Sequence, residues 1–96
     1  MITTKRHGYL QVYLQTLCPP EVMDSFLLQL QAMDIQPEYE VRHGDFREYE
    51  FCYEGTRMVI QYDAFVGICL YADSLENATA AEEEKLLRLA DLLLGA

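Results

Sequence analysis

The stretch that decides the fold is EYEVRHGDFREYEFCYEGTRMVIQYDAFVGICLYA, residues 38–72. Apolar and polar residues alternate along it, which is typical of half-buried β-strands, and its aromatic and β-branched residues favour strands as well. Short turn-like segments interrupt the alternation. The pattern predicts strands at about residues 38–43, 47–53, 57–62 and 66–72, joined as consecutive antiparallel hairpins.

The turns in this stretch also predict a register. We expect loops at residues 44–46, 54–55 and 63–65, because these places carry glycine, aspartate or both. Apolar residues then lie opposite apolar residues, and such pairing fixes the register of a sheet that has one buried face. The expected pairs are Val41 with Tyr49, Tyr49 with Ile60, Phe51 with Met58, Ile60 with Ile68, and Met58 with Leu70. The expected buried face consists of Tyr39, Val41, Tyr49, Phe51, Met58, Ile60, Val66, Ile68 and Leu70.

Three further elements complete the predicted fold. Residues 9–15 alternate as a strand. A helix is expected from Pro20 to about Asp34, since proline is tolerated in a first helical turn. A second helix is expected from about Ala80 to Leu94, after a capping-box pattern that starts at Thr79.

The resulting order, β-α-β-β-β-β-α, predicts an α+β fold. A two-layer sandwich is the simplest way to bury the alternating strands and both amphipathic helices, with a mainly antiparallel sheet and the two helices packed on one face. We expect residues 1–96 to form a single domain with a short flexible N-terminal tail at residues 1–7.

The composition limits the partners and the compartment. Seven basic residues stand against 16 acidic ones, for a formal net charge of -9, so we expect no direct nucleic-acid binding and no membrane attachment. The longest apolar run, residues 64–72, is shorter than the ~20 residues of a membrane helix. Cys18, Cys52 and Cys69 form an odd set without a CxxC pair, and no signal peptide precedes them, so we expect a cytoplasmic protein.

The register gathers charged and polar side chains on the sheet face away from the helices. The functional interpretation is an interaction face for a basic protein partner, and the alternative is an ordinary solvated sheet face. Leu28 and Leu92 lie off the buried helix stripes and would add apolar contacts. An uncovered sheet edge would also allow pairing with another copy of the chain. The expected interaction face consists of Glu38, Glu40, Arg42, Glu48, Glu50, Arg57, Gln61 and Tyr71.

No residue pattern predicts a catalytic, cofactor or metal site. The sequence has no P-loop, GxGxxG, GxSxG or HExxH motif, and His43 lacks the second ligand pair that structural zinc needs. Cys18 is the best candidate nucleophile because it lies just before the first helix, with His7 or His43 as a base. Pro19 follows it directly, however, and removes an amide that would stabilise a thiolate.

The sequence therefore favours a non-enzymatic module for protein–protein interaction or self-association, without a cofactor. One alternative is a small cysteine-dependent enzyme or ligand-binding domain that uses Cys18. The other is a nucleic-acid mimic that inhibits a basic protein, which requires carboxylates in rows spaced like phosphates.

Overall fold

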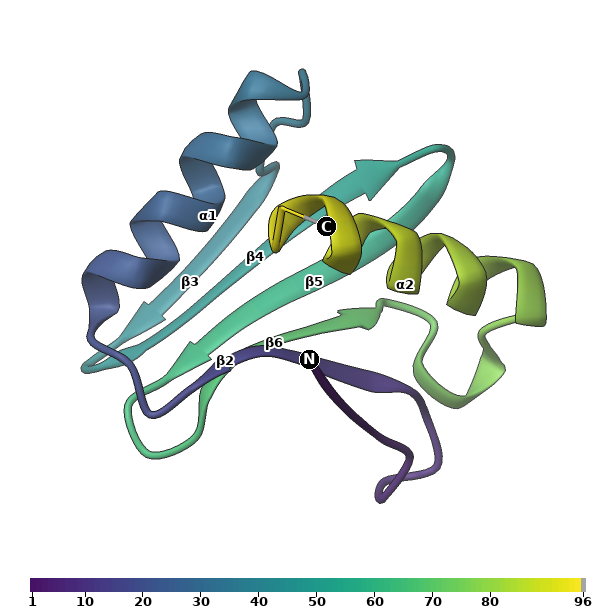
Figure 1. Ribbon diagram of the computed structural model, residues 1–96, viewed down its shortest axis with the longest axis horizontal. Helices are drawn as coiled ribbons and strands as arrows, with labels where there is room; N and C mark the ends of the chain where they lie inside the picture. The colour runs from purple at the N-terminus through teal and green to yellow at the C-terminus, as the bar shows by residue number, and fades with distance from the viewer. Residues whose placement is uncertain (96) are drawn as a thin grey trace.

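The computed structural model describes residues 1–95 as an α+β fold of two helices and a six-stranded antiparallel sheet (Figure 1). The strands are β1 Ile2–Thr4, β2 Gln11–Thr16, β3 Tyr39–His43, β4 Phe46–Tyr53, β5 Thr56–Asp63 and β6 Gly67–Ala72. The helices are α1 Pro20–Ala32 and α2 Ala80–Leu93, and the short 3₁₀ helix η1 Leu75–Asn77 precedes α2.

The strands follow the order β1-β2-β6-β5-β4-β3, so β3 to β6 form consecutive hairpins and β2 pairs with β6. Both helices pack on one face of this sheet (Figure 1), and this confirms the predicted two-layer arrangement. The core between the layers contains side chains that are fully buried, among them Phe51, Ile60 and Leu70 from the sheet, Leu30 from α1 and Leu89 from α2.

The N-terminal segment differs from the expected flexible tail at residues 1–7. Ile2–Thr4 form β1 and pair antiparallel with β2, with Ile2 opposite Tyr13. Gly8 has a φ of +86° in the connecting turn, and its N–H donates to the Lys5 carbonyl at 2.9 Å. The short strand thus satisfies its backbone groups in the sheet, although three residues are too few to show a period in the sequence.

The central hairpins keep the side chains of β4, β5 and β6 on their expected faces. The β4–β5 hairpin has the predicted register, including the pairs Phe51 with Met58 and Tyr49 with Ile60. The β5–β6 hairpin is shifted by two residues, so Ile60 lies opposite Leu70 rather than Ile68. Its loop occupies residues 64–66 instead of 63–65. An even shift exchanges partners but leaves the two faces of the sheet unchanged.

The β3–β4 hairpin departs from the prediction at its loop. The expected loop covers residues 44–46, whereas the loop in the structure contains only Gly44 and Asp45. Gly44 has a φ of +59°, the left-handed conformation that tight two-residue hairpin turns require. Val41 consequently lies opposite Glu48, and the predicted pairing of Val41 with Tyr49 is wrong.

Because the loop is one residue shorter than expected, each side chain of β3 lies on the face opposite to the predicted one. Tyr39 and Val41, which we expected in the core, lie on the outer face of the sheet, and Tyr39 is 58% exposed. Glu40 and Arg42, which we expected on the outer face, lie on the helix side. Val66 was also expected in the core, but it lies in the β5–β6 loop and is 44% exposed.

Local sequence signals explain both helices. α1 starts with Pro20 after Pro19 in extended conformation, and no side chain caps it. α2 begins with the predicted capping box: the Glu82 N–H donates to Thr79 Oγ1 at 3.2 Å, and the Thr79 N–H donates to Glu82 Oε1 at 2.9 Å. Within residues 1–95, neither helix has the length and apolar character that crossing a membrane requires.

Gly67 provides a test of this strand arrangement. It has a φ of +120°, and a Cβ atom there would clash with the Gln15 backbone carbonyl of β2. We expect Gly67→Ala to lower the free energy of unfolding by roughly 3 kcal/mol or more, from strain and overpacking together. Gly44→Ala is the matched control, because its Cβ would meet nothing within 4 Å and only the left-handed backbone costs about 1–2 kcal/mol. Urea unfolding followed by circular dichroism measures both, and equal costs would contradict the close β2–β6 approach.

Candidate functional site

On the outer face of the sheet, which is the face away from the helices, polar and aromatic side chains contact one another. The Tyr71 hydroxyl donates to Glu48 Oε1 at 2.9 Å, and the Tyr71 ring lies 5.7 Å from that of Tyr9. Burial and the Glu48 carboxylate raise the pKa of Tyr71 well above its usual value. Val59 on β5 is only 2% exposed beneath this layer. The predicted face residues that the register places here are Glu48, Glu50, Arg57, Gln61 and Tyr71.

Arg57 engages two acidic side chains at this face. Its Nη1 donates to Glu38 Oε2 at 2.8 Å, and its Nη2 lies 3.6 Å from Glu50 Oε2. Burial raises the pKa of Glu50, and the neighbouring Asp73 acts in the same direction. The Glu38 and Glu50 carboxylates therefore contact Arg57, and the Glu48 carboxylate accepts a hydrogen bond from Tyr71. This arrangement does not favour a phosphate-like row.

Glu40 and Arg42 lie on the opposite side of the sheet, around Tyr49. The Tyr49 hydroxyl donates to Glu40 Oε1 at 3.1 Å and accepts from Arg42 Nη2 at 3.4 Å and Arg47 Nη2 at 2.7 Å. Arg47 also pairs with Asp24 of α1, at 2.8 Å. Burial acts to lower the pKa of Arg47, but these hydrogen bonds outweigh it and raise that pKa. The network joins β3, β4 and α1, and the expected place of Glu40 and Arg42 on the outer face is wrong.

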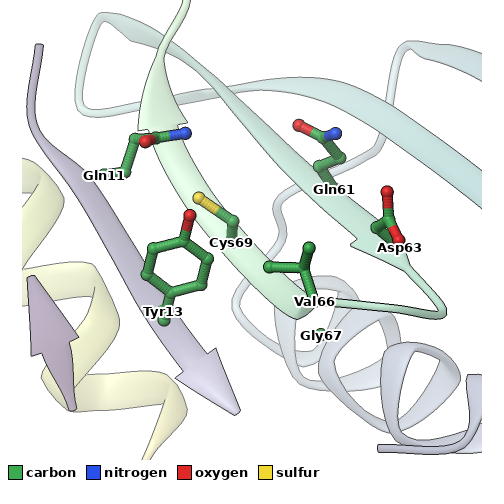
Figure 2. A pocket seen from close by; sticks show the side chains of 7 residues that line it. All are labelled: Gln11, Tyr13, Gln61, Asp63, Val66, Gly67 and Cys69. Atoms are coloured by element: carbon green, nitrogen blue, oxygen red, sulfur yellow. The ribbon is translucent and has the colours of Figure 1, made fainter. Parts of the chain in front are cut away.

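A small pocket opens on the outer face between β2, β5 and β6 (Figure 2). Its volume is about 100 Å³, which is enough for ordered water molecules. Gln11 is 8% exposed, and its Oε1 atom is buried with no hydrogen-bond partner among the described residues. Burial raises the pKa of Cys69 to about 12, so its thiol stays protonated. The pocket offers hydrogen-bonding groups but no activated nucleophile, and its lining is Gln11, Tyr13, Gln61, Asp63, Val66, Gly67 and Cys69.

The three cysteines are free and differ in their surroundings. Cys18 is buried, and burial raises the pKa of its thiol, which disfavours the thiolate that a nucleophile needs. Its backbone carbonyl accepts a hydrogen bond from the Tyr62 hydroxyl at 3.0 Å. Cys52 on β4 is exposed. Across residues 1–95, no three His, Cys, Asp or Glu side chains gather in a way that would hold a metal ion.

Three apolar side chains meet solvent at one end of the sheet, where the β2–α1 and β5–β6 loops lie side by side (Figure 1). Leu17 is 78% exposed, Phe65 is 89% exposed and Val66 is 44% exposed; we call these residues the apolar tip. The Leu17 N–H donates to the Val66 carbonyl at 3.2 Å and so joins the two loops. Leu17 also has a φ of +47°, which costs a residue of this bulk about 1–2 kcal/mol.

A groove of about 220 Å³ lies beside the apolar tip, between the β3–β4 and β5–β6 turns. Phenylalanines supply its apolar wall, and the Asp45 and Asp63 carboxylates give it negative charge. No functional role is predicted for this region from the residue pattern alone. A phenylalanine in a turn, where small or polar residues are usual, is the signal that would have found it. The groove is lined by His43, Asp45, Phe46, Asp63, Ala64 and Phe65.

Leu28 and Leu92, the apolar side chains that we expected to contact a partner, lie on the helices and not in the loops of the apolar tip. Leu28 on α1 is 65% exposed, and Leu92 on α2 is 48% exposed. Isolated exposed leucines are common on protein surfaces. Their exposure alone therefore distinguishes no site, and Leu92 is the control residue in the peptide-binding test of the next subsection.

Thiol reactivity tests the cysteine environments. We expect the native protein to react rapidly with a disulfide reagent at one thiol, Cys52, because Cys18 and Cys69 are buried and their pKa values are raised. Absorbance of the released thiolate at about pH 8 measures the number and rate of reacting groups. Cys52→Ser removes the rapid phase, and all remaining thiols react on unfolding. A rapid phase that survives Cys52→Ser would show that a buried thiol is activated.

The raised pKa of Glu50, from burial and from nearby Asp73, predicts a pH dependence of stability. The pKa of Glu50 is raised in the folded state, so its contribution to stability is fully present below its ordinary value of 4.5 and is lost as the pH rises through the raised pKa. Glu50→Gln imitates the protonated side chain, and we expect it to gain stability relative to the wild type as the pH increases over this window. Urea unfolding across a pH series measures the difference. Asp73→Asn reduces the dependence, and a difference that falls with rising pH would contradict the raised pKa of Glu50.

No family model, no curated protein and no solved structure matches this chain. The function is therefore inferred from the chain's own residues, namely the outer face, the pocket beside Gln11 and the apolar tip.

Proposed function

We propose that this chain is a non-enzymatic protein-interaction module that binds its partner through the apolar tip. The observation that carries the proposal is Leu17, which combines 78% exposure with a left-handed backbone. A glycine or asparagine at this position would relieve the strain. Strained backbone positions cluster at ligand-contacting and switch sites, and at Leu17 the strain coincides with a largely exposed apolar side chain.

The neighbours of Leu17 extend the same surface. Phe65 is 89% exposed at a turn, where a polar residue would leave no aromatic ring in water. Val66 is joined to Leu17 through its backbone carbonyl. Contiguous apolar groups of this kind mark interaction sites far more often than single exposed residues do.

The charge around the apolar tip indicates the chemistry of the partner. Asp45 and Asp63 flank the adjacent groove, and the chain carries a net charge of -9. A partner segment with a large apolar side chain next to lysine or arginine complements both features. An anionic lipid surface would be repelled by the same charge, and so would a nucleic acid.

The remaining features support this proposal over the alternatives. Buried Cys18 and Cys69 have raised pKa values, which weakens the support for a cysteine-dependent enzyme. The outer-face carboxylates are occupied by Arg57 and Tyr71, which weakens the support for a nucleic-acid mimic. Three free cysteines fit a reducing compartment such as the cytoplasm.

A peptide selection tests the proposal. A random peptide library displayed on phage is selected on the wild-type protein, and the selected peptides are titrated into ¹⁵N-labelled protein. We expect peptides that carry a large apolar residue next to lysine or arginine, and we expect chemical-shift changes at Leu17 and at residues 43–46 and 63–67. Phe65→Ser should weaken binding by about tenfold or more, which corresponds to about 1.4 kcal/mol.

Leu92→Ser is the matched control, because it also removes an exposed apolar side chain but lies on α2. It should leave peptide affinity unchanged. The proposal fails if no peptides are enriched, if they bind elsewhere, or if Phe65→Ser binds as well as the wild type. Uptake by neutral lipid vesicles that requires Phe65, without peptide binding, would identify a membrane contact instead.

A further inference from the structure

β3 (Tyr39–His43) is the last strand of the sheet and has a strand on only one side. Its open side presents a row of backbone groups that another strand can pair with. The side chains of Glu40 and Arg42 are 48% and 59% exposed on the helix side, whereas Tyr49 on adjacent β4 is buried. The helix side of β3 is therefore open to solvent at Glu40 and Arg42, although α1 runs alongside this strand (Figure 1). The opposite edge, β1, has only three residues.

The antiparallel pairing determines which backbone groups point outward. In such a pair, alternate residues exchange both hydrogen bonds with the partner strand, and the residues between them direct their N–H and C=O groups away. The turn at residues 44–45 is closed by His43 and Phe46, which form a hydrogen-bonded pair, so the residues of β3 that bond to β4 are Tyr39, Val41 and His43. Glu40 and Arg42 therefore direct their backbone groups to the open side.

A second copy of β3 complements this edge. If two copies pair antiparallel about a two-fold axis at Val41, Glu40 of each copy lies opposite Arg42 of the other, and each of these pairs exchanges both backbone hydrogen bonds. Opposite charges in directly facing positions stabilise strand pairing. An axis at Glu40 or at Arg42 would instead place two like charges face to face, which is destabilising. The charge pattern thus selects one register.

We infer that the chain forms a two-fold symmetric dimer through its β3 strands, which joins two six-stranded sheets into one. The occupant of the edge is a second copy of the same chain because antiparallel pairing about Val41 sets Glu40 opposite Arg42 twice. Glu40 and Arg42 already form an ion pair within one chain at 3.1 Å, and the dimer joins the two such pairs into a network of four alternating charges. The dimer does not depend on the apolar tip. Pairing over five residues is small beside a standard interface, so we expect a dissociation constant of roughly micromolar order.

Sedimentation velocity over a concentration series tests the inference. We expect the wild-type species to move from 11.1 kDa towards twice that mass as concentration rises. Glu40→Arg places arginine opposite Arg42 and should weaken association by about tenfold or more. The exchange Glu40→Arg with Arg42→Glu restores opposite charges without changing the composition, and it should restore the dimer. Thermal unfolding of each variant checks that the monomer fold is retained.

Disulfide trapping tests the register independently. In a Cys52→Ser background, Val41→Cys should form an intermolecular disulfide on oxidation. The facing residues at the two-fold axis form a non-hydrogen-bonded pair, with Cα atoms about 4.5 Å apart, within the range that a disulfide spans. Tyr39→Cys is the matched control, because residue 39 faces residue 43 of the second copy and not its own equivalent.

The outcomes are distinct. A monomer at every concentration up to the millimolar range overturns the dimer. A charge exchange that fails to restore association lost in Glu40→Arg overturns the Glu40–Arg42 pairing, and so does equal cross-linking of Val41→Cys and Tyr39→Cys. None of these results depends on Phe65, so failure here is distinguishable from failure of the proposed apolar-tip function.

Discussion

The number of residues in each hairpin turn is the constraint on which the rest of the structure depends. Side chains alternate between the faces of a strand, so one residue more or less in a turn moves a whole strand's side chains to the other face. The two-residue turn after Tyr53 sets Phe51 opposite Met58, and both are fully buried. The remaining strands pair outward from this hairpin in the order that the sheet shows. The inner face therefore follows from this turn, and both helices pack on it.

The β3–β4 turn shows the same constraint with the opposite result. A core built from Tyr39 and Val41 would gain roughly 1.5–3 kcal/mol for each large apolar side chain that is fully buried. That gain requires something to pack against, and the helix side of β3 is open to solvent at Glu40 and Arg42. With this side of β3 open to solvent, the short turn at Gly44 decides the register, and Glu40 takes the helix side beside Tyr49. The same inversion produces the charged edge from which the dimer is inferred.

The difference between the β4–β5 and β3–β4 hairpins explains which parts of the fold can be predicted from the sequence. Where a strand is covered on one face, as β4 and β5 are, hydrophobic alternation and turn chemistry agree and the prediction is confirmed. The capping box of α2 is equally local and was predicted from its residues. β1 could not be predicted, because three residues show no period and their order depends on pairing with β2. The apolar tip was missed because it is formed by loops far apart in the chain, at Leu17 and Phe65, and only their spatial meeting distinguishes them from scattered surface residues.

The two proposed surfaces lie on different parts of the fold and have compatible geometry. The apolar tip and its groove lie at the end of the sheet where β3 ends and β4 begins. Antiparallel pairing of two β3 strands directs these ends away from each other, so a dimer would carry its two apolar tips at opposite ends of the joined sheet. A single tip of three apolar residues offers a small contact, and a partner with two matching segments would bind the dimer more tightly through effective concentration. In the proposed dimer, pairing of the two β3 edges would double the number of apolar tips that one partner can contact.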